Sequence, residues 1–210
     1  MMTTHVVEER RYTIAIGARP VAFGTCSPGA LHALAAGRLL AEGLLDDRKV
    51  AAIDIDDTNG AIAMRVDLRP PAPHEAEPTI LTGRPEPPLE AMHELFRELF
   101  RCGDERHPDG GVHVAALSDG ERLLHVQTDV GRHNAVDKAI GGALLIDTDT
   151  RMLGLVVSAR VSGEIARKAA AAGLAWIATR SVPTTLAVDV ARHAGIPIVA
   201  RAPTRSPFIW

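Results

Sequence analysis

Several residue types and motifs are scarce in this chain, and each scarcity narrows what the protein can be. Aromatic residues make up 3% of the 210 residues. The only two cysteines, Cys26 and Cys102, exclude a disulfide framework and a cysteine-based zinc ribbon. The longest apolar stretch, residues 169–178, is far shorter than the roughly 18 to 20 residues of a bilayer-spanning helix. The first residues contain no apolar core of a signal peptide. We therefore expect a cytoplasmic protein without a membrane segment.

Charge and motif content exclude further classes. The net charge of −3 argues against a general nucleic-acid-binding protein, although 20 of the 23 basic residues are arginines. The sequence contains neither a phosphate-binding P-loop nor a dinucleotide-binding G-x-G-x-x-G, and it lacks the ligand motifs of a zinc deaminase. A hairpin turn at Asp119-Gly120 would place His113 opposite Val126 and would put His113 and His125 on opposite faces of a sheet. We therefore expect no metal site.

Half of the fourteen prolines fall between residues 69 and 88, which predicts a long loop there. The loop divides the chain into an N-terminal subdomain (residues 1–68) and a core (residues 89–210). In the subdomain, alternating apolar residues predict strands over 11–17 and 21–25 and a hairpin over 50–55 and 61–68. Ser27-Pro28 has the pattern of a helix N-cap, and the apolar spacing from Leu31 to Leu39 predicts one helical face ending at Gly43.

The core has the pattern of a layered α/β protein. A helix is predicted from residue 89, a hairpin over 112–117 and 122–127, and a helix from about residue 135. Strands at 154–157, 174–178 and 196–200 then alternate with helices at 162–172 and 184–194. This alternation predicts parallel strands with helical crossovers and hence a layered mixed sheet.

Three junctions between a predicted strand and the following helix carry the candidate chemistry. They are residues 128–134, 158–162 and 179–185, and each contains one arginine together with short polar side chains. Helix N-termini present unpaired N–H groups, and arginine binds phosphate oxygens through two hydrogen bonds. The three junctions together predict a site for a phosphate-bearing or pyrophosphate-bearing ligand. The first junction is especially rich in polar groups, and a purely structural buried network is the alternative explanation there.

Two long motifs resemble a known family. Residues 110–117 (GGVHVAAL) and 129–138 (DVGRHNAVDK) resemble the formate dehydrogenase accessory sulfurtransferases of the FdhD family. The similarity continues through residues 158–164 and 180–187, Lys168 and Gly173, and upstream through the helix that ends at residues 42–45.

This resemblance implies a cytidine-deaminase-like core and a homodimer that binds molybdopterin guanine dinucleotide. It also implies two partners: a cysteine desulfurase that supplies sulfur, and formate dehydrogenase or another molybdoenzyme that receives the cofactor. Arg132, Arg160 and Arg180 would hold phosphates. The full set of expected cofactor-binding residues is Gly111, His113, Asp129, Gly131, Arg132, His133, Asn134, Asp137, Lys138, Ser158, Arg160, Ser162, Arg180, Ser181, Thr184, Arg201 and Arg205.

The sequence departs from the family where sulfur would be carried. Thr82 and Pro85 stand where the family has the two cysteines of its C-x-x-C loop, and neither side chain can form a persulfide. In one hypothesis Cys26 or Cys102 replaces the missing thiols. In the alternative, the chain is a non-catalytic chaperone or regulator that binds the cofactor. A nucleotide hydrolase or deaminase is a third class, which lacks its metal ligands.

Overall fold

The N-terminal part of the chain forms a four-stranded sheet covered by one helix. The computed structural model describes residues 6–45, 49–58, 61–70 and 83–210. The strands are β1 (Arg10–Ile16), β2 (Arg19–Cys26), β3 (Lys49–Asp56) and β4 (Ala61–Arg69), and they lie in the order β2-β1-β4-β3. Only β1 and β4 are parallel. Alternate side chains such as Ile14 and Met64 face helix α1 (Leu31–Ala41), because successive residues of a strand point to opposite faces.

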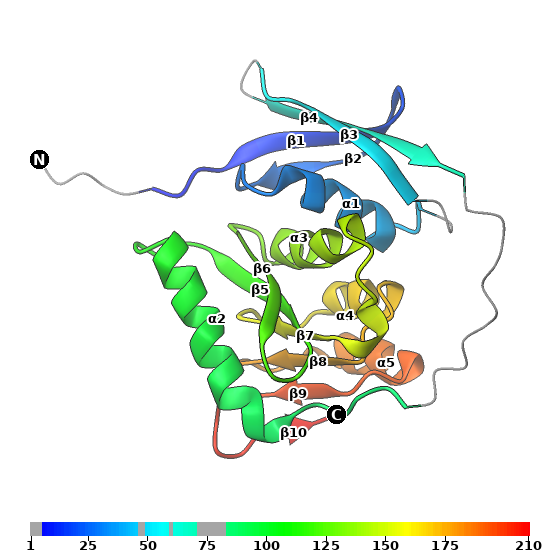
Figure 1. The fold of residues 1–210 in the computed structure, drawn as a ribbon. Helices are drawn as coiled ribbons and strands as arrows, with labels where there is room; N and C mark the ends of the chain where they lie inside the picture. The colour runs from blue at the N-terminus through cyan, green and yellow to red at the C-terminus, as the bar shows by residue number, and fades with distance from the viewer. Residues whose placement is uncertain (1–5, 46–48, 59–60, 71–82) are drawn as a thin grey trace, which may run out of the picture.

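The second sheet is larger and carries helices on both faces. Its strands are β5 (His113–Ser118), β6 (Leu123–Asp129), β7 (Gly154–Val157), β8 (Trp176–Thr179), β9 (Ile198–Ala200) and β10 (Phe208–Ile209), in the order β10-β9-β8-β7-β5-β6. Strands β7, β8 and β9 are parallel, and the remaining pairs are antiparallel. One face packs against α3 (Arg132–Leu145), α4 (Gly163–Ala171) and α5 (Thr185–Ala194), and the other against α2 (Met92–Arg106) (Figure 1). Two short 3₁₀ turns, Leu89–Ala91 and Thr150–Met152, complete the described elements.

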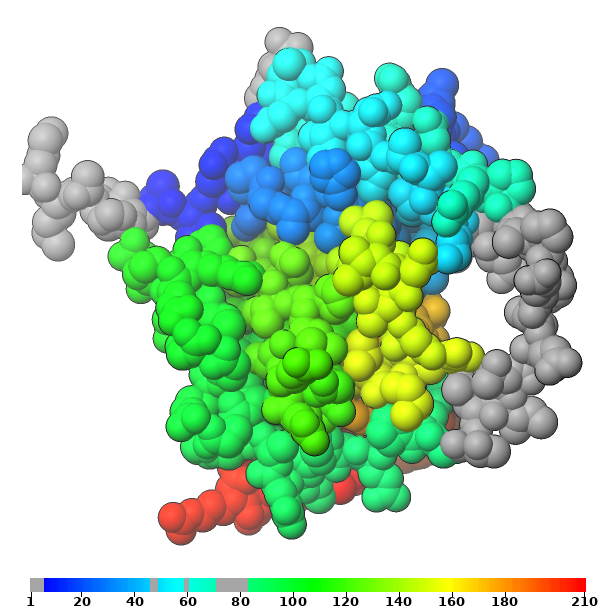
Figure 2. All heavy atoms as spheres, viewed as in Figure 1, coloured from blue at the N-terminus to red at the C-terminus, as the bar shows by residue number. Residues whose placement is uncertain are grey.

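Helices α1 and α3 join the two sheets through a close helix crossing. A Cβ atom on Gly37 would lie 1.9 Å from the carbonyl oxygen of Asp137, and one on Gly141 would lie 1.9 Å from that of Ala33. Only glycine permits such an approach of two backbones. In the space-filling view, the N-terminal sheet with α1 (blue to cyan) rests directly on the rest of the molecule (Figure 2).

The layered mixed α/β fold is confirmed, and so are both hairpins of the first sheet and the parallel strands β7, β8 and β9. Ser162 and Thr184 cap α4 and α5, with their hydroxyl oxygens accepting the backbone N–H groups of Ile165 and Ala187. The strand β10 was not expected from the sequence.

Three local predictions are wrong. Helix α1 begins at Leu31 rather than after Ser27, and its N-cap residue Ala30 has a left-handed backbone (φ 52°). Helix α3 begins at Arg132, three residues before Ala135. In the β5–β6 hairpin, His113 pairs with Asp129 instead of Val126. The last pair before the loop is Ser118 with Leu123, so the loop is longer than a turn at Asp119-Gly120, and a register shift between Ala115 and Leu117, near His125 with its left-handed backbone (φ 49°), adds one more residue.

The register shift also changes where the two histidines point. His113 shares a cavity with Arg132 of α3, and the His125 ring lies against Gly142 of the same helix. Both rings therefore lie on the α3 side of the sheet, at opposite ends of that helix, and not on opposite faces as the simple turn predicted. Within the described ranges, no three His, Cys, Asp or Glu side chains are grouped as a metal site would need.

Candidate functional site

A cavity of about 280 Å³ opens where β6 and β7 end and α3, α4 and α5 begin. It is lined by His113, Arg132, Ala159, Arg160, Ser162 and Thr184, and we call it the arginine cavity. The capping residues of two helices, Ser162 and Thr184, form part of its wall, so the positive ends of α4 and α5 are directed at it. The geometry thus brings residues from all three predicted junctions to one place.

The charge of the arginine cavity comes from its two arginines. Neither Arg132 nor Arg160 makes an ion pair with any residue in the described part of the chain, and both are exposed. His113 adds no charge at neutral pH, because burial and the nearby Arg132 lower its pKa. Two unpaired guanidinium groups beside two helix N-termini favour an anionic ligand with several oxygens, such as a pyrophosphate.

His133 supports the wall of this cavity. Its Nε2 atom lies 3.1 Å from the Ser162 hydroxyl and 3.5 Å from a carboxylate oxygen of Glu164. Burial is the main cause that lowers the pKa of His133. The neutral ring can accept the Ser162 O–H, which leaves the Ser162 oxygen free to cap α4.

Asp129, Asn134 and Lys138 form a buried polar network behind the cavity. The Asp129 carboxylate pairs with Lys138 Nζ at 2.6 Å and accepts hydrogen bonds from the backbone N–H groups of Ser27 and Gly131 and from the Asn134 amide. Lys138 also donates to the Ser27 carbonyl oxygen, and Asn134 to that of Thr25. These bonds fasten the end of β2 to the start of α3. The geometry therefore favours a structural role for Asp129, Asn134 and Lys138 over direct contact with a ligand.

A second buried ion pair joins α3 to α4. Lys168 Nζ donates to both carboxylate oxygens of Asp137, at 2.7 and 2.9 Å. Burial nevertheless raises the pKa of Asp137 to about 6, with Lys168 opposing the shift. Arg38 of α1 lies 3.9 Å from both Asp137 and Glu164, so this cluster ties three helices together.

The remaining expected binding residues lie outside the arginine cavity. Arg180 stacks on Phe100 of α2, 5.3 Å from the ring centre, and Arg201 stacks on Phe208. Ser158 accepts the Val114 N–H, and the Ser181 carbonyl accepts the Arg201 N–H. Gly111 has a left-handed backbone (φ 79°), and Arg205 is exposed near the C-terminus.

Neither cysteine is placed as a reactive thiol. Cys26 is buried at the end of β2, and its burial raises its pKa to about 11. Cys102 lies in the last turns of α2, where burial and the Glu98 carboxylate raise its pKa. Of the two positions expected to replace the family's cysteines, Pro85 lies in an irregular segment and Thr82 lies outside the described residues.

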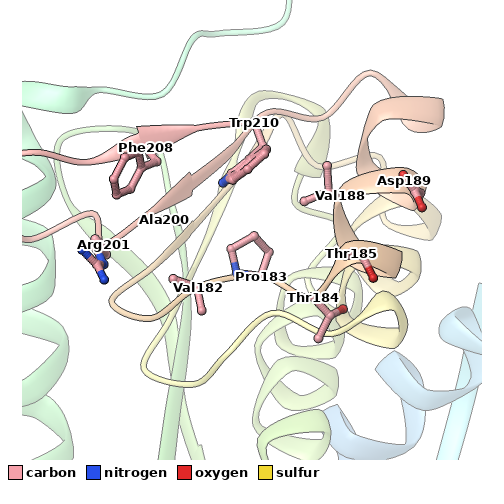
Figure 3. A pocket seen from close by; sticks show the side chains of 10 residues that line it. All are labelled: Val182, Pro183, Thr184, Thr185, Val188, Asp189, Ala200, Arg201, Phe208 and Trp210. Atoms are coloured by element: carbon pink, nitrogen blue, oxygen red, sulfur yellow. The ribbon is translucent and has the colours of Figure 1, made fainter.

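Two features of the structure were not predicted from the sequence. Ser27, expected to cap a helix, instead contributes to the Asp129 network, and no local pattern indicates this because its partners are 102 and 111 residues away. A second cavity lies next to the C-terminal segment, lined in part by Trp210 (Figure 3). The only sequence feature that indicated this cavity was Trp210 itself, because aromatic residues are rare in the chain.

No helix in the described ranges combines the length and apolar character required to span a bilayer.

Comparison with known proteins identifies the relatives of this chain. Residues 72–210 match the FdhD/NarQ family. The chain is 33% identical to the sulfur carrier protein FdhD of Streptomyces coelicolor over 92% of its length and 82% of that protein. It is 38% identical to FdhD of Bacillus licheniformis, over 54% of this chain and 43% of that protein. The matches to this and the Bacillus subtilis protein thus span less than half of those relatives.

A solved structure agrees with this similarity at the level of the fold. A protein assigned as a formate dehydrogenase accessory protein, from Desulfotalea psychrophila, superimposes with a TM-score of 0.79 at 24% identity. The superposition covers 97% of this chain and 86% of that one. On the family match and the Streptomyces relative, this chain belongs to the FdhD/NarQ family.

Proposed function

We propose that this protein serves in molybdenum cofactor maturation by binding a molybdopterin guanine dinucleotide-type ligand, with the ligand's phosphates in the arginine cavity. The main support for the proposal is that Arg132 and Arg160, which make no ion pair in the described part of the chain, line one cavity together with the N-cap residues of two helices. A pyrophosphate provides the oxygens that such donors bind. The names of the relatives, sulfur carrier and formate dehydrogenase accessory protein, support the biological setting.

In this proposal the arginines hold phosphate oxygens and the other groups support them. Ser162 and Thr184 keep the N-termini of α4 and α5 directed at the ligand, while His133 fixes the Ser162 hydroxyl. The Asp129–Lys138 network holds α3, and with it Arg132, against the N-terminal sheet. The cofactor itself would bring the metal-binding chemistry.

We further propose that the chain binds the cofactor without relaying sulfur, as a chaperone or regulator of another family member. The raised pKa values of Cys26 and Cys102 support this version, because the thiolate is the form that accepts and passes on sulfur. In the competing version one of these thiols receives sulfur from a cysteine desulfurase and transfers it for formate dehydrogenase or another molybdoenzyme. A homodimer is compatible with both versions.

Calorimetric titration with GDP tests the binding site. Arg132→Ala and Arg160→Ala should each weaken binding by about 1.5 to 3 kcal/mol, the range for a hydrogen bond to a charged group. Arg122→Ala is the matched control, because Arg122 lies in the β5–β6 loop and is exposed. Unchanged affinity in both cavity variants would contradict the proposed site.

Persulfide loading separates the two versions. The purified protein is incubated with a cysteine desulfurase and cysteine, beside a family member that retains the C-x-x-C loop, and each intact mass is measured. We expect the control to gain sulfur and this chain to gain none. A sulfur adduct that disappears in Cys26→Ser or Cys102→Ser would instead support a relocated relay.

A further inference from the structure

Ser162 lies between the arginine cavity, which it lines, and the titratable ring of His133. The Nε2 atom of His133 is 3.1 Å from the Ser162 hydroxyl and 3.5 Å from a carboxylate oxygen of Glu164. On its other side, the same hydroxyl accepts the backbone N–H of Ile165 at 3.4 Å. The hydrogen bonds of one serine therefore connect the state of a histidine to the wall of the cavity.

The Ser162 hydroxyl has one hydrogen to donate and two lone pairs with which to accept. When Nε2 of His133 carries no proton, it accepts the Ser162 O–H, and this hydrogen is not available to a ligand. When Nε2 carries a proton, it donates to the Ser162 oxygen, which also accepts the Ile165 N–H. Both lone pairs are then used, and the O–H is free to donate to a ligand oxygen in the cavity.

The charges around the ring make its protonation sensitive to an anion. The charged groups that act on His133 are Arg132 on its own helix, Arg38 on α1, and Glu164 and Lys168 on α4. The three cations disfavour a proton on the ring and Glu164 favours one, while burial is the largest cause that keeps the pKa of His133 below its usual range. An anion beside Arg132 would offset part of this positive charge and so favour protonation.

We propose that His133 is a positioning residue whose protonation turns the Ser162 O–H toward a phosphate oxygen in the arginine cavity, so that phosphate binding and proton uptake favour each other. This inference rests on the proposed function, because it requires a phosphate in that cavity. One proton leaves the buffer and binds Nε2 of the ring. Ser162 keeps its own hydrogen and changes only the atom to which it donates. The ligand is then held more tightly at lower pH and released more readily as pH rises.

A pH titration of the full chain followed by NMR measures the charge of the ring. The imidazole signals of His133 are identified by their loss in His133→Gln. We expect the midpoint of their titration to lie at a higher pH when sulfate or GDP is bound than in the free protein. A midpoint that neither bound ligand changes would overturn the proposal.

The affinity for sulfate tests the role of Ser162. Sulfate is the probe because its own charge stays constant where histidine titrates. Its affinity should rise about 5-fold or more as pH falls through that range, the lower limit of common coupling between two binding events. His133→Gln can still hydrogen-bond to Ser162 but cannot titrate, so it should lose most of this pH dependence. Ser162→Gly should lose it as well, because glycine is an adequate N-cap and leaves no O–H to be turned.

Two controls separate this mechanism from a general effect of charge. His93→Gln removes an exposed histidine of α2 and should keep the full pH dependence. His113→Gln removes the histidine that lines the cavity and should keep most of it. Persistence of the pH dependence in Ser162→Gly, or its loss in His113→Gln, would overturn the proposal and leave the phosphate site in place. Failure of both sulfate and GDP to bind at any pH would overturn the proposed function together with this inference.

Discussion

Replacing Lys138 by methionine tests whether the polar residues of the DVGRHNAVDK motif hold the structure together. Lys138 is fully buried, and its ammonium group lies 2.6 Å from Asp129 and 2.9 Å from the Ser27 carbonyl oxygen. Methionine has a similar length but carries no charge and no donor. The Asp129 carboxylate would keep its three N–H donors and lose its only cation within hydrogen-bonding distance among the described residues.

The expected cost is large because the change leaves one charge of a buried pair uncompensated. Removing one partner of such a pair destabilises a protein by about 3–5 kcal/mol. Urea denaturation followed by circular dichroism should therefore show a much lower midpoint for Lys138→Met with an unchanged slope. The double variant Asp129→Asn/Lys138→Met should cost at least about 1 kcal/mol less than the sum of the two single variants, because the pair is coupled.

The control is Lys49→Met, which removes a lysine from the solvent-exposed pair with Asp147 and should leave the midpoint nearly unchanged. If Lys138→Met is as stable as this control, or if the two single effects simply add, the Asp129–Lys138 pair does not support the fold as argued. In that event a direct role in ligand binding becomes the better explanation of the motif.

Two further predictions concern stability. Gly141→Ala should destabilise the protein by about 1–3 kcal/mol or more, measured by urea denaturation, because its Cβ would meet the carbonyl of Ala33. Gly142→Ala should be close to wild type, because the nearest atoms to its Cβ would be those of the His125 side chain, at 3.3 Å or more. Burial lowers the pKa of His125 and His133 below 6.5, so the unfolded chain binds these protons at a higher pH than the folded chain does. The two histidines should therefore lower the free energy of unfolding as pH drops below about 6.5, whereas Asp137, whose pKa burial raises to about 6, acts in the opposite direction. His125→Asn, which tolerates the left-handed backbone, should make that fall shallower, and an unchanged pH profile would contradict the assignment.

Local sequence patterns predicted the structure correctly where the contacts that determine it are close in sequence. The starts of helices α4 and α5 were predicted at Ser162 and Thr184 from the local pattern, and in the structure each hydroxyl accepts a backbone N–H three residues ahead. Ser27 has the same appearance, yet its side chain accepts the N–H of Val130, 103 residues away. A cap pattern thus predicts a cap only where no distant partner competes for the hydroxyl.

The arginines of the candidate site also show that local sequence patterns do not predict where a side chain points. The sequence places Arg132, Arg160 and Arg180 at equivalent junctions, and the structure directs only the first two to one cavity. Arg180 turns to the other face of the sheet, where the Phe100 ring of α2 attracts the guanidinium group. Side-chain direction at a strand end depends on which helix covers each face, and adjacent residues do not encode this.

The sequence by itself determined the alternation of strands and helices, the gathering of polar residues at the strand ends and the absence of any C-x-x-C pair, because residue type and short-range spacing decide these properties. Only the tertiary structure decided the β5–β6 register, the burial of the Asp129–Lys138 pair and the meeting of Arg132 and Arg160 with the N-caps of α4 and α5 at one cavity. Each of these depends on contacts between segments far apart in the chain, where packing and backbone geometry override local preference.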